Sequence, residues 1–253
     1  MPPERCPITA DLHTHNLFSH KDSPASPAEV VRACHKRNLQ GIAVTNHNTI
    51  EGTAQTKEAA RSLGVPLLVI AGEEITTAKL NPAGKRVEVL ALFLQEAIPP
   101  NLSVDQTLEE IKKQDALVAI PHPFELWRHG AGPEIAIEII RRAQEMGIPV
   151  LWEVFNSRSS FKNNRLACDF LRGAGEGFAD KLLLMVGSDA HHPGEVGRAR
   201  LHLERWENKE DLLQKLPTGK RLASACEGYN EIYVTLFYRA LNKLLLAYKQ
   251  SNH

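Results

Sequence analysis

The chain has 253 residues, and its 30 Lys and Arg residues balance 30 Asp and Glu residues, so the formal net charge is zero. This length fits one large domain or two small ones, and ordinary apolar (43%) and charged (24%) contents exclude a disordered or fibrous protein. Zero net charge disfavours binding to long nucleic acids or anionic membranes. The longest wholly apolar run, residues 65–72, is far shorter than the ~18 residues that a membrane span needs.

The N-terminus and the cysteines predict the cellular compartment. The first residues lack the apolar core of a secretory signal. Cys6, Cys34, Cys168 and Cys226 lie far apart, without metal-binding or redox spacing. We therefore expect a cytoplasmic protein with reduced thiols.

Seven short segments rich in Val, Ile and Leu predict strands that are buried on both faces of a parallel sheet. They are residues 8–12, 41–45, 67–71, 87–93, 117–120, 149–154 and 182–186. Helical patterns separate them, so repeated strand–helix units favour an α/β barrel, with a doubly wound open sheet as the alternative.

Several helices have recognisable ends. Ser26 and Glu29 form a predicted capping box around Pro27, and Ser103 and Gln106 predict another. Further helices are expected to begin at Pro133 and Glu134, with Gly147 at the end, and over residues 231–249, where a long amphipathic helix is expected to close one end of the domain.

Histidines and carboxylates follow five of the predicted strands. The segments are 11–15 (Asp-Leu-His-Thr-His), 45–48 (Thr-Asn-His-Asn), 72–74 (Gly-Glu-Glu), 121–123 (Pro-His-Pro) and 187–192 (Gly-Ser-Asp-Ala-His-His). One histidine after a strand is most often a solvated loop residue. Five such segments favour a shared site, because the carboxyl ends of barrel strands converge at one mouth. Imidazoles and carboxylates together are ligands of divalent transition metals.

In this order and spacing, the five segments resemble the polymerase and histidinol phosphatase (PHP) domain family over residues 8–200. Residues 152–158 also resemble the corresponding segment of stand-alone members. The resemblance implies a distorted (β/α)7 TIM-like barrel in a single domain over residues 1–253, with 208–253 as a C-terminal helical closing segment. It also implies phosphoesterase activity with two or three divalent metal ions. Mn²⁺ is favoured, and Zn²⁺, Fe²⁺ or Mg²⁺ are possible.

The resemblance further implies a set of metal ligands. They are His13, His15, Asp22, His47, Glu74, His122, Asp189 and His191. The first metal would take His13, His15, Glu74 and Asp189. The second would share Glu74 and add His122, and the third would take His47, His191 and a ligand from the loop after His15.

Three positions depart from the family pattern. Counting back from Ser26 selects Asp22 as the loop ligand, whereas counting forward from His15 selects His20, and Asp22 is preferred. Asn46 replaces a supporting acid before His47. Glu88 stands where many members have a histidine, so it is either a substitute ligand or a neighbour of a weakly bound second metal.

The expected reaction is hydrolysis of a phosphomonoester, from a nucleotide-like or other small phosphorylated metabolite, by a hydroxide that bridges two metals. Asp189 is a candidate proton acceptor, and His191 or His47 is a candidate to assist the leaving oxygen if the third metal is absent. Arg158 and Arg128, with His129, are candidates to hold phosphate oxygens, since a guanidinium binds them in a bidentate manner.

Other functions stay open. They are a short-oligonucleotide exonuclease, an amidohydrolase-type hydrolase and a non-catalytic metal-binding module. The expected partner is a small phosphorylated substrate, without membrane or long nucleic acid. The sequence does not determine the oligomeric state.

Overall fold

The computed structural model describes residues 7–19, 22–80, 85–173 and 178–218. One eight-stranded sheet curves through this part of the chain in the order β7-β6-β5-β4-β3-β2-β1-β8. The strands are β1 (Pro7–Thr14), β2 (Gly41–Val44), β3 (Leu68–Thr76), β4 (Glu88–Leu92), β5 (Leu117–Ile120), β6 (Val150–Asn156), β7 (Leu183–Gly187) and β8 (Leu201–Glu204). All seven predicted strands are therefore confirmed, and β8 is an additional short strand.

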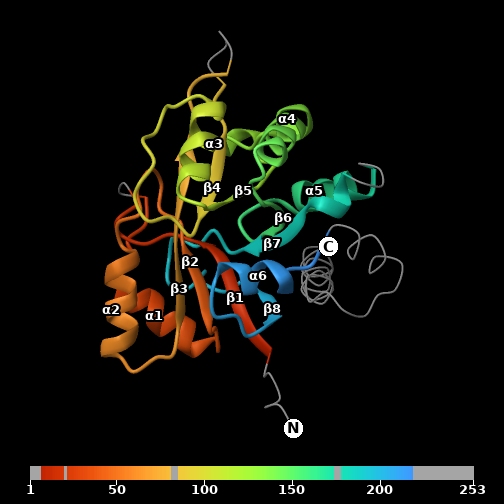
Figure 1. Cartoon of the computed structure of the whole chain (residues 1–253). Coiled ribbons are helices and arrows are strands. Elements are labelled where there is room, and N and C mark those ends of the chain that lie inside the picture. The colour runs from red at the N-terminus through yellow and green to blue at the C-terminus, as the bar shows by residue number, and fades with distance from the viewer. Residues whose placement is uncertain (1–6, 20–21, 81–84, 174–177, 219–253) are drawn as a thin grey trace, which may run out of the picture.

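Helices lie outside the curved sheet, as Figure 1 shows. They are α1 (Pro27–Lys36), α2 (Thr53–Ser62), α3 (Val104–Lys113), α4 (Gly132–Glu145), α5 (Phe161–Gly173) and α6 (Lys209–Lys215), with short 3₁₀ turns η1 (Leu126–Arg128) and η2 (Ala179–Lys181). The predicted capping boxes at Ser26 and Ser103 are both present. None of the helices in the described ranges is long and apolar enough to cross a membrane. The helix expected over residues 231–249 lies outside the described residues.

The prediction of a wholly parallel sheet is wrong at β4 and at β8. Strand β4 runs antiparallel to both β3 and β5, and β8 runs antiparallel to β1. A parallel return needs a crossover of a dozen or more residues, usually a helix, and no helix is described between Thr76 and Glu88. The reversal pairs Glu88 with Thr76, so the first residue of β4 lies beside the last residue of β3.

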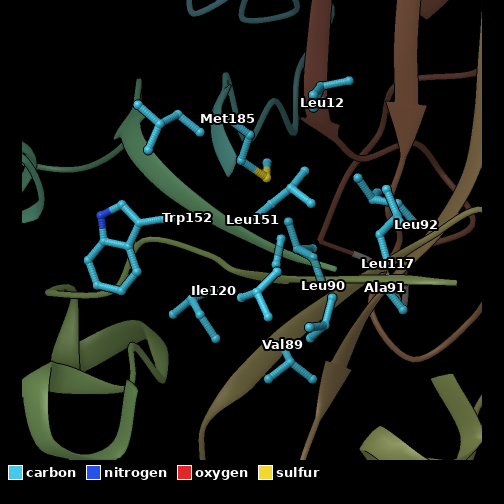
Figure 2. Packing of buried hydrophobic residues seen from close by; sticks show 14 of the residues in the cluster. Leu12, Val89, Leu90, Ala91, Leu92, Leu117, Ile120, Leu151, Trp152 and Met185 are labelled. Atoms are coloured by element: carbon cyan, nitrogen blue, oxygen red, sulfur yellow. The ribbon is translucent and has the colours of Figure 1, made fainter. Parts of the chain in front are cut away.

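Apolar side chains from the strands fill the interior away from the mouth. Figure 2 shows Leu12, Leu90, Leu117, Leu151 and Met185 approaching one another from five different strands. These residues are at most 1% exposed. Continuous burial along β2, β4, β5 and β6 explains why their sequences are apolar without alternation.

The barrel nearly closes between β1 and the segment after β7. Strand β8 pairs with one end of β1, and at the other end the His15 amide donates to the Ala190 carbonyl (2.9 Å) and the Asp189 amide to the His13 carbonyl (2.7 Å). Buried Asp11 supports this seam, because its carboxylate accepts the backbone N–H groups of Ser188 (2.8 Å) and Gly197 (2.7 Å). Burial raises the pKa of Asp11 to about 6, although these hydrogen bonds oppose the shift.

Gly187 allows the seam to close tightly. A Cβ atom at this position would lie 2.2 Å from the Cβ of His13 and 2.6 Å from Oε1 of Glu153. Both neighbours are held in the buried interior, so neither has room to retreat.

We therefore expect Gly187→Ala to lower the free energy of unfolding by about 1–3 kcal/mol, as overpacked cores do. The matched control is Gly173→Ala at the end of α5, where no described atom lies within 4 Å of the added Cβ. Chemical denaturation of both variants checks this. Equal stability of Gly187→Ala and the wild type would contradict the tight seam.

Candidate metal centre

Imidazoles and carboxylates from four strands meet at one end of the barrel. His13 lies in β1 and Glu74 in β3, whereas His15, His122 and Asp189 follow β1, β5 and β7 within two residues. All five are at most 2% exposed. Three of these ligand candidates therefore lie just beyond the end of a strand. His13 and Glu74 lie within the last three residues of their strands.

The first cluster contains His13, His15, Glu74 and Asp189. Nε2 of His13 lies 3.2 Å from Nε2 of His15 and 3.4 Å from Oε2 of Glu74. Nε2 of His15 lies 3.3 Å from Oε2 of Glu74 and 3.4 Å from Oδ1 of Asp189. Four ligand atoms ~2.1 Å from a tetrahedral metal ion lie ~3.4 Å apart, so the cluster has the dimensions of a metal site.

The second cluster contains His122, Glu74 and Glu88. Nε2 of His122 lies 2.8 Å from Oε1 of Glu74 and 3.8 Å from Oε2 of Glu88. The two oxygens of Glu74 therefore face different imidazoles, which places this carboxylate between the first and second clusters. Glu88 is the first residue of β4, and it lies at the mouth because β4 runs antiparallel to β3.

The third cluster contains Asp22, His47 and His191. Oδ2 of Asp22 lies 3.1 Å from Nε2 of His47 and 3.3 Å from Nε2 of His191. His47 also presents Nδ1 to Oε2 of Glu74 (3.3 Å), so it links Glu74 to the third cluster. His20 lies outside the described residues, whereas the structure brings Asp22 to both imidazoles.

Glu153 holds His13 in place, although Glu153 is not among the predicted site residues. Its Oε1 lies 3.0 Å from Nδ1 of His13, and its Oε2 accepts the backbone N–H of His122 at 2.5 Å. A carboxylate on Nδ1 orients the ring and leaves Nε2 as the ligand atom. The signal was a single charged residue inside the fully buried β6 segment Leu-Trp-Glu-Val-Phe.

Asp189 is anchored through one oxygen and open at the other. Arg128 Nη2 donates to Oδ2 of Asp189, and Asn156 Nδ2 donates to the same oxygen at 3.1 Å. Oδ1 is buried, has no hydrogen-bond partner among the described residues and faces His13 and His15. An orphaned buried carboxylate oxygen among imidazoles fits a metal ligand.

Two of these residues have a left-handed backbone. The φ angle is 28° at His122 and 54° at Asp189, a region that costs energy for residues with a side chain. The amide of each residue is nevertheless hydrogen-bonded, to Glu153 and to the His13 carbonyl respectively. Glu153 therefore holds the turn at His122 in this conformation, and the seam holds the turn at Asp189.

The adjacent residue Glu73 points away from the mouth. Its Oε2 accepts the backbone N–H of Ile98 at 2.8 Å, and burial raises its pKa to about 7. Neighbouring residues of a strand point to opposite sides, which explains why only Glu74 reaches the imidazoles. Asn46 lies beside the site, where it accepts the Asn16 amide (2.8 Å) and donates to the Glu51 carbonyl (2.7 Å).

The pKa shifts follow from burial and from the opposite charges in the mouth. Burial raises the pKa of Glu88 to about 8, and the charge of Glu74 adds to the effect. Burial opposes the charged form of His47, but the nearby Glu74, Asp22 and Glu88 carboxylates outweigh it and raise its pKa to about 9. For Glu74 the imidazoles outweigh burial and hold its pKa well below its usual range.

The two arginine candidates lie at different depths. Arg128 is partly buried, and its Nη1 has no hydrogen-bond partner among the described residues. Arg158 is exposed and contacts Nδ1 of His191. His129 is exposed, and its backbone carbonyl accepts the amide of Glu88 at 3.0 Å.

The fold and the cluster define a class of protein: a distorted barrel whose mouth carries histidines and carboxylates in metal-binding arrangements. A family model for the PHP domain matches residues 11–216. A protein of Methanocaldococcus jannaschii named only as uncharacterized is 30% identical over 213 residues, covering 82% of this chain and 76% of the relative. The chain therefore belongs to the PHP domain family, which confirms the resemblance.

Further similarity supports the fold. A second uncharacterized protein of the same archaeon is 36% identical over 126 residues, covering 46% of this chain and 68% of the relative. A solved two-domain protein from Bacteroides vulgatus, described as containing a predicted PHP-like metal-dependent phosphoesterase, matches with a TM-score of 0.58 and 23% identity. The match covers 75% of this chain and 54% of that one. It confirms the expected distorted TIM-like barrel.

The loop ligand can be tested directly. We expect Asp22→Ala to lower the amount of metal bound per chain more than His20→Ala does, because the Asp22 carboxylate reaches two imidazoles. Metal analysis of both purified variants, loaded under identical conditions, measures the difference. A larger loss for His20→Ala would assign the ligand to His20 instead.

Proposed function

We propose that this protein is a metal-dependent phosphoesterase that hydrolyses a phosphomonoester of a nucleotide-like or other small metabolite. The observation that carries the proposal is the position of Glu74, whose two oxygens face separate groups of imidazoles. A carboxylate shared in this way is suited to hold two cations close together. Two such cations neutralise a phosphate ester and lower the pKa of water, which is the chemistry that phosphoester hydrolysis needs.

The residues that would hold the metals are those of the three clusters. His13, His15, Glu74 and Asp189 supply four converging ligand atoms. His122 and Glu88 extend the set on one side of Glu74, and Asp22, His47 and His191 extend it on the other. The donor types, imidazole nitrogen and carboxylate oxygen, suit Mn²⁺, Fe²⁺ and Zn²⁺.

Asp189 is placed to accept a proton from the attacking water. The charges of His13 and Arg128 and a hydrogen bond with His15 outweigh burial and hold the pKa of Asp189 well below its usual range. Its Oδ2 is occupied by Arg128 and Asn156, so Oδ1 is the oxygen that would face both the first metal and the proton of the attacking water. Arg128 thereby fixes the orientation of the base.

Positive groups at the rim are placed to bind the substrate. Nη1 of Arg128 lies beside the buried carboxylates without a described hydrogen-bond partner, so it can donate to a non-bridging phosphate oxygen. Arg158 reaches the same region through its contact with His191. When no third metal is bound, His191 is placed to donate a proton to the leaving oxygen.

Two neighbouring glutamates give a matched test of the site. We expect Glu74→Gln to lower kcat/KM by more than ~100-fold and to release metal, because it removes the shared charge between two clusters. Glu73→Gln is the control, since this residue is equally buried but faces Ile98. Phosphate release from a panel of phosphorylated metabolites, with metal content measured on the same samples, gives the result.

His13→Ala and Asp189→Ala are expected to show the same loss as Glu74→Gln. Full activity of Glu74→Gln with unchanged metal content would contradict the proposed role of the clusters. Metal binding by the wild type without phosphate release from any compound would indicate a metal-binding module without this activity.

The carboxylate Glu88 leads to a prediction about the metal. A second cluster with two carboxylates and one imidazole is a harder ligand set than one with a histidine at position 88, so it favours Mn²⁺ over Zn²⁺. We expect metal-free protein reconstituted with Mn²⁺ to be faster than protein reconstituted with Zn²⁺. Glu88→His is expected to narrow or invert the ratio, and steady-state rates with each metal measure it.

A higher rate with Zn²⁺ in the wild type, or an unchanged ratio in Glu88→His, would contradict a ligand role for Glu88. Zinc binding alone does not decide the matter, because intrinsic affinity rises from Mn²⁺ to Zn²⁺ regardless of turnover.

A further inference from the structure

An exposed tryptophan stands on the turn that leads from β5 into α4. Trp127, in η1, is 96% exposed, and its neighbour Leu126 is 59% exposed. The other two tryptophans, Trp152 and Trp206, are at most 2% exposed. Large aromatic side chains normally bury most of their surface, so packing does not explain the position of Trp127.

The turn that carries Trp127 is fixed at its base. The amide of Glu125 donates to the His122 carbonyl (2.9 Å), and the amide of Gly130 donates to the Glu125 carbonyl (3.0 Å). The Glu125 side chain accepts the amide of Ser160 at 2.8 Å, which ties the turn to the loop after β6. The exposure of Trp127 is therefore a property of an ordered turn.

The same turn belongs to the rim of the metal centre. It begins at His122, a candidate ligand, and the carbonyl of His129 accepts the amide of Glu88 at 3.0 Å. Arg128, next to Trp127, reaches Asp189 inside the mouth. One short turn thus carries a guanidinium that reaches into the site and, at the preceding position, an aromatic side chain that is exposed to solvent.

We propose that Trp127, with Leu126, forms a stacking platform for a planar aromatic ring, such as a nucleobase, on the organic side of the phosphoester. The proposal rests on the proposed function and specifies its substrate class. Arg128 binds the phosphate, and the adjacent Trp127 binds the ring. An aromatic side chain that stacks on a base contributes about 5- to 150-fold in affinity, and it tolerates different bases because each has a π-face.

Two substrates that differ only in the ring provide the test. Adenosine 5′-monophosphate and ribose 5-phosphate share the phosphate and the sugar, and only the first carries a base. Trp127→Ala is expected to lower kcat/KM for adenosine 5′-monophosphate by about 5- to 150-fold, mainly through KM, and for ribose 5-phosphate by less than about 2-fold. Trp127→Phe keeps a π-face and is expected to retain most of the rate.

Leu63→Ala is the surface control, since Leu63 is 40% exposed at the end of α2, away from the turn. It is expected to leave both substrates unchanged. An equal loss for both substrates in Trp127→Ala, or no loss for either, would overturn the platform. Concentration-dependent association of the wild type that Trp127→Ala abolishes would also overturn it, because Trp127 would then be a contact between copies.

A binding measurement separates the platform from the proposed activity. Trp127 is the exposed tryptophan of the chain, so quenching of its fluorescence reports a ring that stacks on it. A phosphonate analogue of adenosine 5′-monophosphate, which resists hydrolysis, is expected to quench the metal-loaded wild type and to lose this effect in Trp127→Phe. The corresponding analogue of ribose 5-phosphate is expected to quench neither protein.

The combined outcomes distinguish the two proposals. Quenching by the adenosine analogue without phosphate release from any compound would refute the phosphoesterase and keep the ring-binding site. Phosphate release from both compounds with no quenching, and no preference for the ring, would refute the platform and keep the phosphoesterase.

Discussion

The carboxylate of Glu74 is the charge on which the rest of the site depends. It is fully buried, and its oxygens lie 2.8–3.4 Å from nitrogens of His13, His15, His47 and His122. An ion removed from water costs several kcal/mol unless it is paired and hydrogen-bonded. Four imidazoles from three separate segments must therefore converge on one residue of β3, and this requirement fixes the register of the strands around it.

The second buried carboxylate in the mouth, that of Glu88, has a raised pKa. Glu88 lies among the same imidazoles, but Glu74 and Asp189 already balance their charge. Burial and these like charges raise the pKa of Glu88 to about 8, so near neutral pH its carboxyl group is mostly protonated in the metal-free protein. A divalent cation in the mouth would reverse the sign of the local field and favour ionised Glu88.

The sequence predicted the strands and the residues at the mouth, but not the direction of β4 or the role of Glu153. Apolar runs mark a buried strand whichever way it runs, so the segment 87–93 gave no sign of its reversal. Direction depends on the connection, and the available signal was that the described residues between Thr76 and Glu88 form no helix. Glu153 stands out as a single charge in an apolar segment, but its role was not predictable, because its contact with His13 joins distant positions and has no local pattern.

The seam between β1 and β7 has a further consequence for how the molecule opens. At the mouth this seam is held by a few backbone hydrogen bonds and the Asp11 side chain, whereas every pair of neighbouring strands in the sheet is joined by a ladder of paired residues. Sub-global opening starts where the fewest interactions must break, so amide exchange is expected to begin here and leave the ladders protected. His13 lies on one side of the seam and Asp189 on the other. A cation held by both residues would cross-link the two sides of the seam, where unfolding is expected to begin. Removal of the metal would therefore first increase local opening, and with it amide exchange, at this part of the barrel wall.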